Sequence, residues 1–142
     1  MIRSKAQRRA SGERPTPKEC GNKLREAKRL IGLGKWYPAN PGKLAEEFEE
    51  LEQSFGIDLT SPEDLKMVFS AALAEIGTDH YDGRYPPEPS KEIRTSGFEM
   101  FPFCWESKFF QGVTMYFKFS LGKNGVLWIY SFHPSRGEGN DD

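Results

Sequence analysis

The chain has 142 residues, of which 37% are hydrophobic and 13% aromatic. This length is typical of one domain with its own core, and the aromatic content excludes a wholly disordered chain. No apolar run approaches eighteen residues and no signal-peptide core is present, so we expect a soluble, cytoplasmic protein with no membrane partner.

The formal net charge of −1 conceals a strong asymmetry along the chain. Residues 1–35 carry eleven Lys and Arg against three acids, residues 36–99 carry five against fourteen, and residues 100–142 carry four of each. A basic N-terminal segment beside an acidic middle suggests either a tail that binds polyanions or association of the two halves. A solvated tail without a specific role explains the same charges equally well.

The two cysteines, Cys20 and Cys104, lie in different kinds of segment, with no CxxC motif and no histidine at metal-ligand spacing. This pattern argues against a zinc site and against a disulfide framework. We therefore expect reduced thiols, no metal site and no cofactor.

The N-terminal half predicts a tail and three helices. Residues 1–20 are polar, basic and broken by prolines, which is typical of a disordered tail. Apolar residues then recur at helical spacing and predict helices at 22–33, 41–55 and 62–76. Asn40-Pro41 and Ser61-Pro62 supply a capping side chain followed by a proline at the first helical position.

The C-terminal half predicts a long loop and three strands. Residues 78–96 contain three prolines and no strand-like alternation, and a loop of this length is often functional. The strands are expected near 98–105, 113–121 and 126–133. Helices followed by an antiparallel meander predict one α+β domain over residues 21–136, with a disordered acidic tail at 137–142.

Polar residues recur at alternate positions of the last two strands. In residues 113–121 the polar face holds Thr114, Tyr116, Lys118 and Ser120. In residues 126–133 one face holds Val126, Trp128, Tyr130 and Phe132, and the other holds Leu127, Ile129, Ser131 and His133. Strict alternation would therefore keep Leu127 and Ile129 beside Ser131 and His133.

The register of this hairpin decides which of the polar residues face one another. A two-residue type I′ turn at the Asn-Gly pair, 124–125, places Tyr116 opposite His133 and Lys118 opposite Ser131. A four-residue loop would slip the pairing by two residues. A two-residue slip does not change faces, so both registers predict that the four polar side chains share one face.

A tyrosine, a lysine and a histidine on one sheet face are suited to phosphodiester chemistry without a metal. Lysine can neutralise a phosphate, histidine can exchange a proton near neutral pH, and tyrosine can orient either group or stack on a base. Each residue alone is more often structural: Lys118 as a solvated lysine, Tyr116 as a packing residue and His133 as a strand-end histidine. Only the occurrence of all three residues on one sheet face favours a functional site.

Four stretches, in order over roughly residues 24–136, carry a family resemblance. They are AKRLIGLGKW at 27–36, FGIDLTSPEDLKMVFSAALAEIGTDHYDG at 55–83, MYFKF at 115–119 and IYSFH at 129–133. These stretches resemble the MqsR-type messenger-RNA-cleaving toxins of the RelE-like superfamily. The resemblance implies two to three N-terminal helices on a twisted antiparallel sheet, a metal-independent endoribonuclease of a type II toxin-antitoxin system, messenger RNA as substrate and an antitoxin protein as partner.

The resemblance also assigns residues by position. The family's tyrosine two residues before a strand lysine falls on Tyr116, that lysine on Lys118, and the basic residue after Ser-Phe on His133. Where the family has a lysine after an acid-aromatic-Tyr segment, this chain has Asp82, and Arg84 is the candidate to supply the missing cation. The family's strand glutamine has no matching position here.

These assignments predict a catalytic set and a binding set. His133 would act as general acid or base, Lys118 and Arg84 would stabilise the phosphate, and Tyr116 would position the substrate. The residues expected to contact RNA are Ser131, Arg136 and Lys108.

Two other interpretations stay open. Asp82 and the acidic middle segment depart from the family, which favours a non-catalytic module that binds a protein or RNA on the same face. In that case the aromatic residues Trp105, Phe109 and Phe110 would suit a partner surface, although such residues are more often core. In the second interpretation, the residues from 98 onward form a structural hairpin of an unrelated fold.

Overall fold

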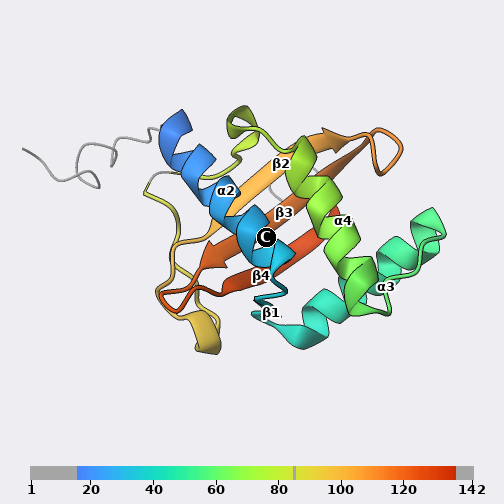
Figure 1. Ribbon diagram of the computed structural model, residues 1–142, viewed down its shortest axis with the longest axis horizontal. Coiled ribbons are helices and arrows are strands. Elements are labelled where there is room, and N and C mark those ends of the chain that lie inside the picture. The colour runs from blue at the N-terminus through green and yellow to red at the C-terminus, as the bar shows by residue number, and fades with distance from the viewer. Residues whose placement is uncertain (1–15, 85, 137–142) are drawn as a thin grey trace, which may run out of the picture.

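A computed structural model describes residues 16–84 and 86–136, in which three α-helices pack against a four-stranded sheet (Figure 1). This arrangement confirms the predicted α+β class. The tails predicted at 1–20 and 137–142 lie outside the described residues except for 16–20. No helix within the described ranges has the length and apolar character needed to cross a membrane.

The helices are α2 (Pro17–Gly32), α3 (Pro41–Phe55) and α4 (Pro62–Glu75). Each begins with a proline that follows a capping side chain, because the proline lacks the N–H that the first turn leaves unpaired. The caps are Thr16, Asn40 and Ser61, which accept hydrogen bonds from the backbone N–H groups of Glu19, Lys43 and Asp64.

The expectation that residues 17–20 belong to a tail is wrong. Helix α2 begins at Pro17, because Thr16-Pro17 forms the same cap and proline pair as the other two helices. Cys20, assigned to the tail from sequence, is 1% exposed and packs in the core with Leu24.

The sheet contains β1 (Trp36–Pro38), β2 (Phe101–Ser107), β3 (Val113–Leu121) and β4 (Leu127–Pro134). Its order is β1-β4-β3-β2, with β1 parallel to β4 and the other pairs antiparallel. The predicted meander is confirmed, but the purely antiparallel sheet is wrong at one edge. The three-residue strand β1 was missed because it is too short to show alternation.

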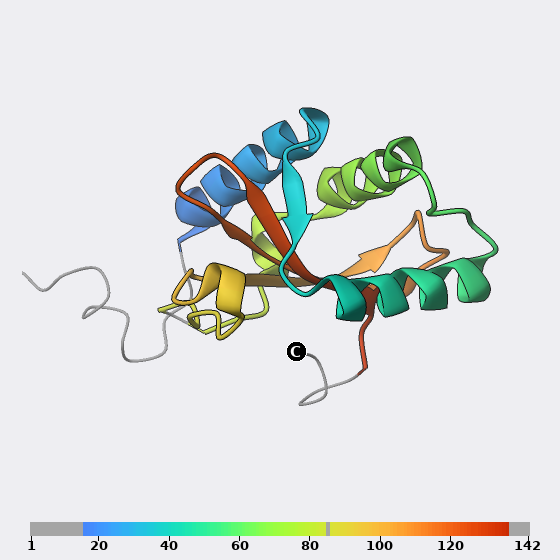
Figure 2. The same ribbon diagram turned by 90° about the horizontal axis from the view of Figure 1, so that it is seen from below.

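The sheet has one covered face and one face that carries the groove described below. Figure 2 shows α2 and α4 on one side of the sheet, and the segment between the short 3-10 helix η1 (Thr78–His80) and β2 on the other. Phe69 of α4 anchors the covered face, with its ring 5.8 Å from that of Phe117 and 5.2 Å from that of Phe132. Helix α3 lies against β4, and its first turn reaches the polar face, where Lys43 Nζ donates to Ser131 Oγ.

The predicted pairing of the hairpin is confirmed, but the predicted turn is wrong. Tyr116 pairs with His133 and Lys118 with Ser131. The loop spans residues 122–126 and is closed by a hydrogen bond from Gly122 N to Val126 O at 2.8 Å, so it is not a two-residue turn.

A β-bulge reconciles this longer loop with the predicted pairs. The register shifts between Lys118 and Phe119, where Ser131 and Ile129 are the successive partners and Tyr130 is the extra residue. One extra residue also reverses the alternation of β4. Leu127 and Ile129 are therefore buried in the core, and the expectation that they share a face with Ser131 and His133 is wrong.

Candidate active site

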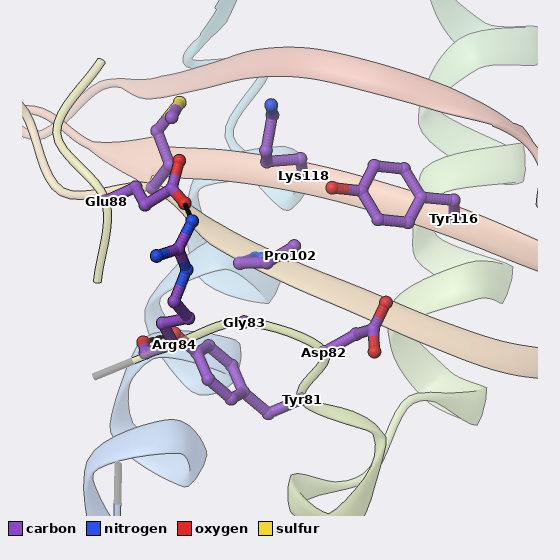
Figure 3. Close-up of a pocket in the computed structure, with 9 residues that line it drawn as sticks. Tyr81, Asp82, Gly83, Arg84, Glu88, Pro102, Tyr116 and Lys118 are labelled. Carbon is purple, nitrogen blue, oxygen red and sulfur yellow. Dashed lines mark hydrogen bonds and ion pairs between the residues drawn. The ribbon is translucent and has the colours of Figure 1, made fainter. Parts of the chain in front are cut away.

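The first feature of the polar face is a pocket of about 310 Å³, which we call the Tyr116 pocket. Its lining residues are Tyr81, Asp82, Gly83, Arg84, Glu88, Met100, Pro102, Tyr116 and Lys118. Strand β3 supplies Tyr116 and Lys118, β2 supplies Pro102, and the loop after α4 supplies the opposite wall (Figure 3). Two predicted catalytic residues thus meet the loop predicted to be functional.

The loop wall is held close to the sheet by short contacts. Asp82 N donates to Pro102 O at 2.9 Å, and the Tyr81 hydroxyl donates to Arg84 O at 2.6 Å. A Cβ atom on Gly83 would lie 2.6 Å from the Tyr81 hydroxyl and 2.8 Å from Pro102 Cγ. Only glycine therefore lets the chain pass this close to β2 and form the pocket wall.

Lys118 is the most perturbed cation of the groove. Its side chain is 9% exposed, and burial, together with repulsion from Lys43, lowers its pKa to about 8. Attraction from the carboxylates of Glu88, Glu47 and Glu92 opposes this shift only in part. A lysine with this pKa is present in both protonation states near neutral pH, which suits proton transfer.

A second pocket, the Lys43 pocket, adjoins the first and has a volume of about 440 Å³. Its lining residues are Lys43, Glu88, Pro89, Ser90, Lys91, Glu92, Met100, Lys118 and Tyr130. Glu88, Met100 and Lys118 line both pockets, so together they form one groove with Lys118 at its centre.

Sequence reasoning missed Lys43, which reaches the groove from the first turn of α3. Its Nζ donates to Ser131 Oγ at 2.9 Å, and burial lowers its pKa. The capping pair Asn40-Pro41 locates this helical turn in the sequence. The docking of the turn against β4 is a long-range contact that no local pattern reveals.

The wall of the Lys43 pocket is fixed by a buried hydroxyl network. The Tyr130 hydroxyl lies 2.8 Å from Thr95 Oγ1 and 2.9 Å from Ser120 Oγ, and Ser90 Oγ lies 2.8 Å from Thr95 Oγ1. Because Tyr130 is the bulge residue, the bulge itself directs this hydroxyl to the loop. The loop is thereby attached to the sheet at residues 90 and 95.

Tyr116 and His133 pack against each other across the strands. Their rings stack with centroids 5.2 Å apart, and Tyr116 is 2% exposed. Figure 3 shows the Tyr116 hydroxyl pointing along the sheet towards Lys118. Tyr116 therefore presents its oxygen to the groove and its ring to His133.

The structure does not place His133 in an open groove, and that expectation is wrong. The side chain is 0% exposed and lines neither pocket. Nδ1 lies 2.7 Å from Pro134 O and Nε2 lies 2.8 Å from Arg136 Nη1. The sequence placed His133 at a strand end, but its burial depends on Tyr116, α3 and the chain after β4.

The other predicted residues divide into two groups. Arg84 lines the Tyr116 pocket, where its Nη2 forms an ion pair with Glu88 Oε1 at 2.7 Å, and Ser131 is buried beneath Lys43. Lys108 is exposed in the turn between β2 and β3 and lines neither pocket. Arg136 contacts His133 instead of the groove.

The aromatic residues considered as a partner surface are mostly core. Trp105 is 2% exposed and Phe110 is 1% exposed, whereas Phe109 is 39% exposed. Glu75 of α4 anchors this turn by accepting from Trp105 Nε1 at 3.0 Å and from Phe109 N at 2.9 Å. The turn is thus tied to the covered side of the sheet.

Within residues 16–84 and 86–136, no three His, Cys, Asp or Glu side chains come together as a potential metal site.

Comparison of the chain with protein-family models, with curated proteins and with solved structures finds no match.

Proposed function

We propose that this protein is a metal-independent endoribonuclease whose proton-transfer residue is Lys118. The observation that carries the proposal is the placement of a buried lysine of pKa about 8 beside Tyr116 in a pocket of suitable size. The resemblance of the sequence to messenger-RNA-cleaving toxins supports the same chemistry.

In this mechanism the neutral amine of Lys118 accepts the proton of an RNA 2′-hydroxyl. The 2′-oxygen then forms a bond to the adjacent phosphorus, and the bond from phosphorus to the 5′-oxygen breaks. The leaving oxygen takes a proton from solvent, which yields a 2′,3′-cyclic phosphate and a 5′-hydroxyl. Arg84 is the cation available to stabilise the charge on the phosphoryl oxygens, and Tyr116 positions the nucleotide.

His133 has a positioning role in this proposal. Its ring packs on that of Tyr116, and both of its ring nitrogens have partners in the protein. It therefore supports the orientation of the Tyr116 hydroxyl and does not exchange a proton with the substrate.

The experiment is an RNA cleavage assay with two substitutions of Lys118. Lys118→Met should lower the rate by about 10²-fold or more, since placed proton-transfer groups contribute about 10²–10⁴. Lys118→Arg keeps a positive charge but stays protonated, so it should be nearly as inactive. The rate of the unmodified protein should rise with pH to a plateau above about pH 8, which is the pKa of Lys118.

Lys66→Met is the matched control, because Lys66 is an exposed lysine of α4 and lines neither pocket. It should cleave at the unmodified rate. Equal cleavage by the Lys118→Met protein would refute the proposal.

A second candidate, a non-catalytic RNA-binding module, is favoured by one observation. Asp82 stands in the Tyr116 pocket, where a carboxylate repels phosphate. This candidate predicts equal retention of an RNA and of its 2′-O-methyl analogue, with no product from either. Cleavage of the RNA alone would exclude it.

A further inference from the structure

Lys43 and Lys118 reach the same pocket from different elements. Lys43 comes from α3 and Lys118 from β3, and both line the Lys43 pocket. Ser131 connects them, because it pairs with Lys118 across the strands and accepts a hydrogen bond from Lys43 Nζ. The two ammonium groups are close enough for Lys43 to lower the pKa of Lys118.

Two of the carboxylates around these lysines, Glu47 and Glu88, also have other partners. Glu47 Oε2 lies 3.9 Å from Lys43 Nζ, but Oε1 of the same side chain accepts from Phe132 N. Glu88 forms its ion pair with Arg84 at 2.7 Å. Lys118 has no ion pair within 4 Å among the described residues.

Two additional charged groups, Lys91 and Glu92, line the pocket mouth and offset each other in sign. On the side of α3, Arg136 adds to the positive potential at Lys43. Two partly buried lysines that repel each other across a shared pocket are stabilised by an anion placed between them.

We propose that Lys43 and Lys118 form an oxyanion subsite in the Lys43 pocket that holds a phosphate group next to the Tyr116 pocket. Sulfate or phosphate oxygens would accept hydrogen bonds from both ammonium groups. Oxyanion binding at this subsite does not depend on the proposed function. The assignment of the phosphate to RNA does rest on it. If the ligand is RNA, the bound group is a backbone phosphate adjacent to the one that is cleaved.

The first test needs no substitution and uses sulfate, whose charge does not change between pH 6 and 9. The side-chain NMR signal of Lys118 is followed through a pH titration with and without sulfate, at constant ionic strength held with chloride. An anion bound to the charged lysine must raise its pKa, so the midpoint should move upward from about 8. An unchanged midpoint would overturn the subsite, whatever the RNA cleavage assay gives.

The second test measures sulfate affinity of variants by the same NMR titration. Lys43→Gln should weaken sulfate binding by about tenfold, in line with the loss of one charged hydrogen bond. Lys66→Gln, which removes the same charge from the opposite side of the sheet, should bind as the unmodified protein does. Equal affinity in the Lys43→Gln and Lys66→Gln proteins would contradict the proposal.

The source of the phosphate is decided with a 2′-O-methyl oligoribonucleotide, which cannot be cleaved, and with a nucleoside monophosphate. Weaker oligonucleotide binding by Lys43→Gln, with a shallower salt dependence, indicates a backbone phosphate and supports the subsite. Weaker binding of the monophosphate alone also supports the subsite and assigns it to a free nucleotide. Unchanged affinity for both ligands would refute it.

Discussion

Arg136 covers His133, with its Nη1 2.8 Å from the imidazole Nε2. The other ring nitrogen, Nδ1, lies 2.7 Å from Pro134 O, which can only accept a hydrogen bond. We infer that Nδ1 carries the proton and that Nε2 accepts from the guanidinium. Neither nitrogen then faces the groove, so this contact turns a residue expected to be catalytic into a structural one.

His133→Ala should therefore lower the free energy of unfolding by about 2–4 kcal/mol, because it empties a buried site beside Tyr116. Urea denaturation measures this change. Arg136→Ala removes an exposed side chain and should cost much less. A His133→Ala protein of unaltered stability that had lost RNA cleavage would instead make His133 the proton-transfer residue.

Lys118→Met should stabilise the fold at pH 7. The pKa of Lys118 is about 8 in the folded protein and about 10.4 in an unfolded chain, so the unfolded state binds more protons between these values. The unmodified protein therefore gains stability as the pH rises from 8 to about 10.4, whereas the variant lacks this term. The difference between their unfolding free energies should be largest below pH 8 and should shrink across this window.

This pH dependence is checked by urea denaturation of both proteins at pH 7 and pH 10. Lys66→Met serves as the control, because Lys66 is exposed and should show no such window. A constant difference between Lys118→Met and the unmodified protein at both pH values would show that burial does not perturb Lys118.

Asp82→Lys should strengthen RNA binding, because it replaces a carboxylate of the Tyr116 pocket with a cation. One added phosphate contact should steepen the dependence of affinity on salt by about 0.7 in logarithmic slope for a single strand. Glu49→Lys makes the same charge change on an exposed position of α3 that lines neither pocket. Equal effects of the two substitutions would mean that only net charge matters.

Glu47→Ala should destabilise the protein by about 2–4 kcal/mol, since it leaves the buried N–H of Phe132 without its acceptor. Glu47 is 4% exposed and its Oε1 lies 2.9 Å from Phe132 N, at a part of β4 that β1 does not reach. Glu47→Gln keeps an oxygen at this position and should recover most of the loss. Thermal denaturation of the two variants measures both changes in stability. An equal loss of stability in both would mean that the charge of Glu47, and not its hydrogen bond to Phe132 N, stabilises the protein.

The local elements of the fold could be predicted from the sequence. The pairs Asn40-Pro41 and Ser61-Pro62 start α3 and α4 where they were predicted, because a cap and a proline act within one helical turn. The alternation of residues 113–121 placed Tyr116 and Lys118 on one face, because side-chain direction in a strand is also a local property. The bulge at Tyr130 has no recognisable pattern in the sequence. The predicted pairing of the hairpin was correct although the predicted turn was wrong, because the bulge compensates for the longer loop.

The environment of each polar side chain depends on long-range packing and could not be predicted from the sequence. Burial and pKa depend on elements distant in sequence, and α3 brings Lys43 and Glu47 against β4 although more than eighty residues separate them. Burial and repulsion from Lys43 lower the pKa of Lys118, while Arg136 closes over His133. Tyr116, Lys118 and His133 look alike as candidates in the sequence, but only the first two line the groove, because long-range packing determines which polar groups border a pocket.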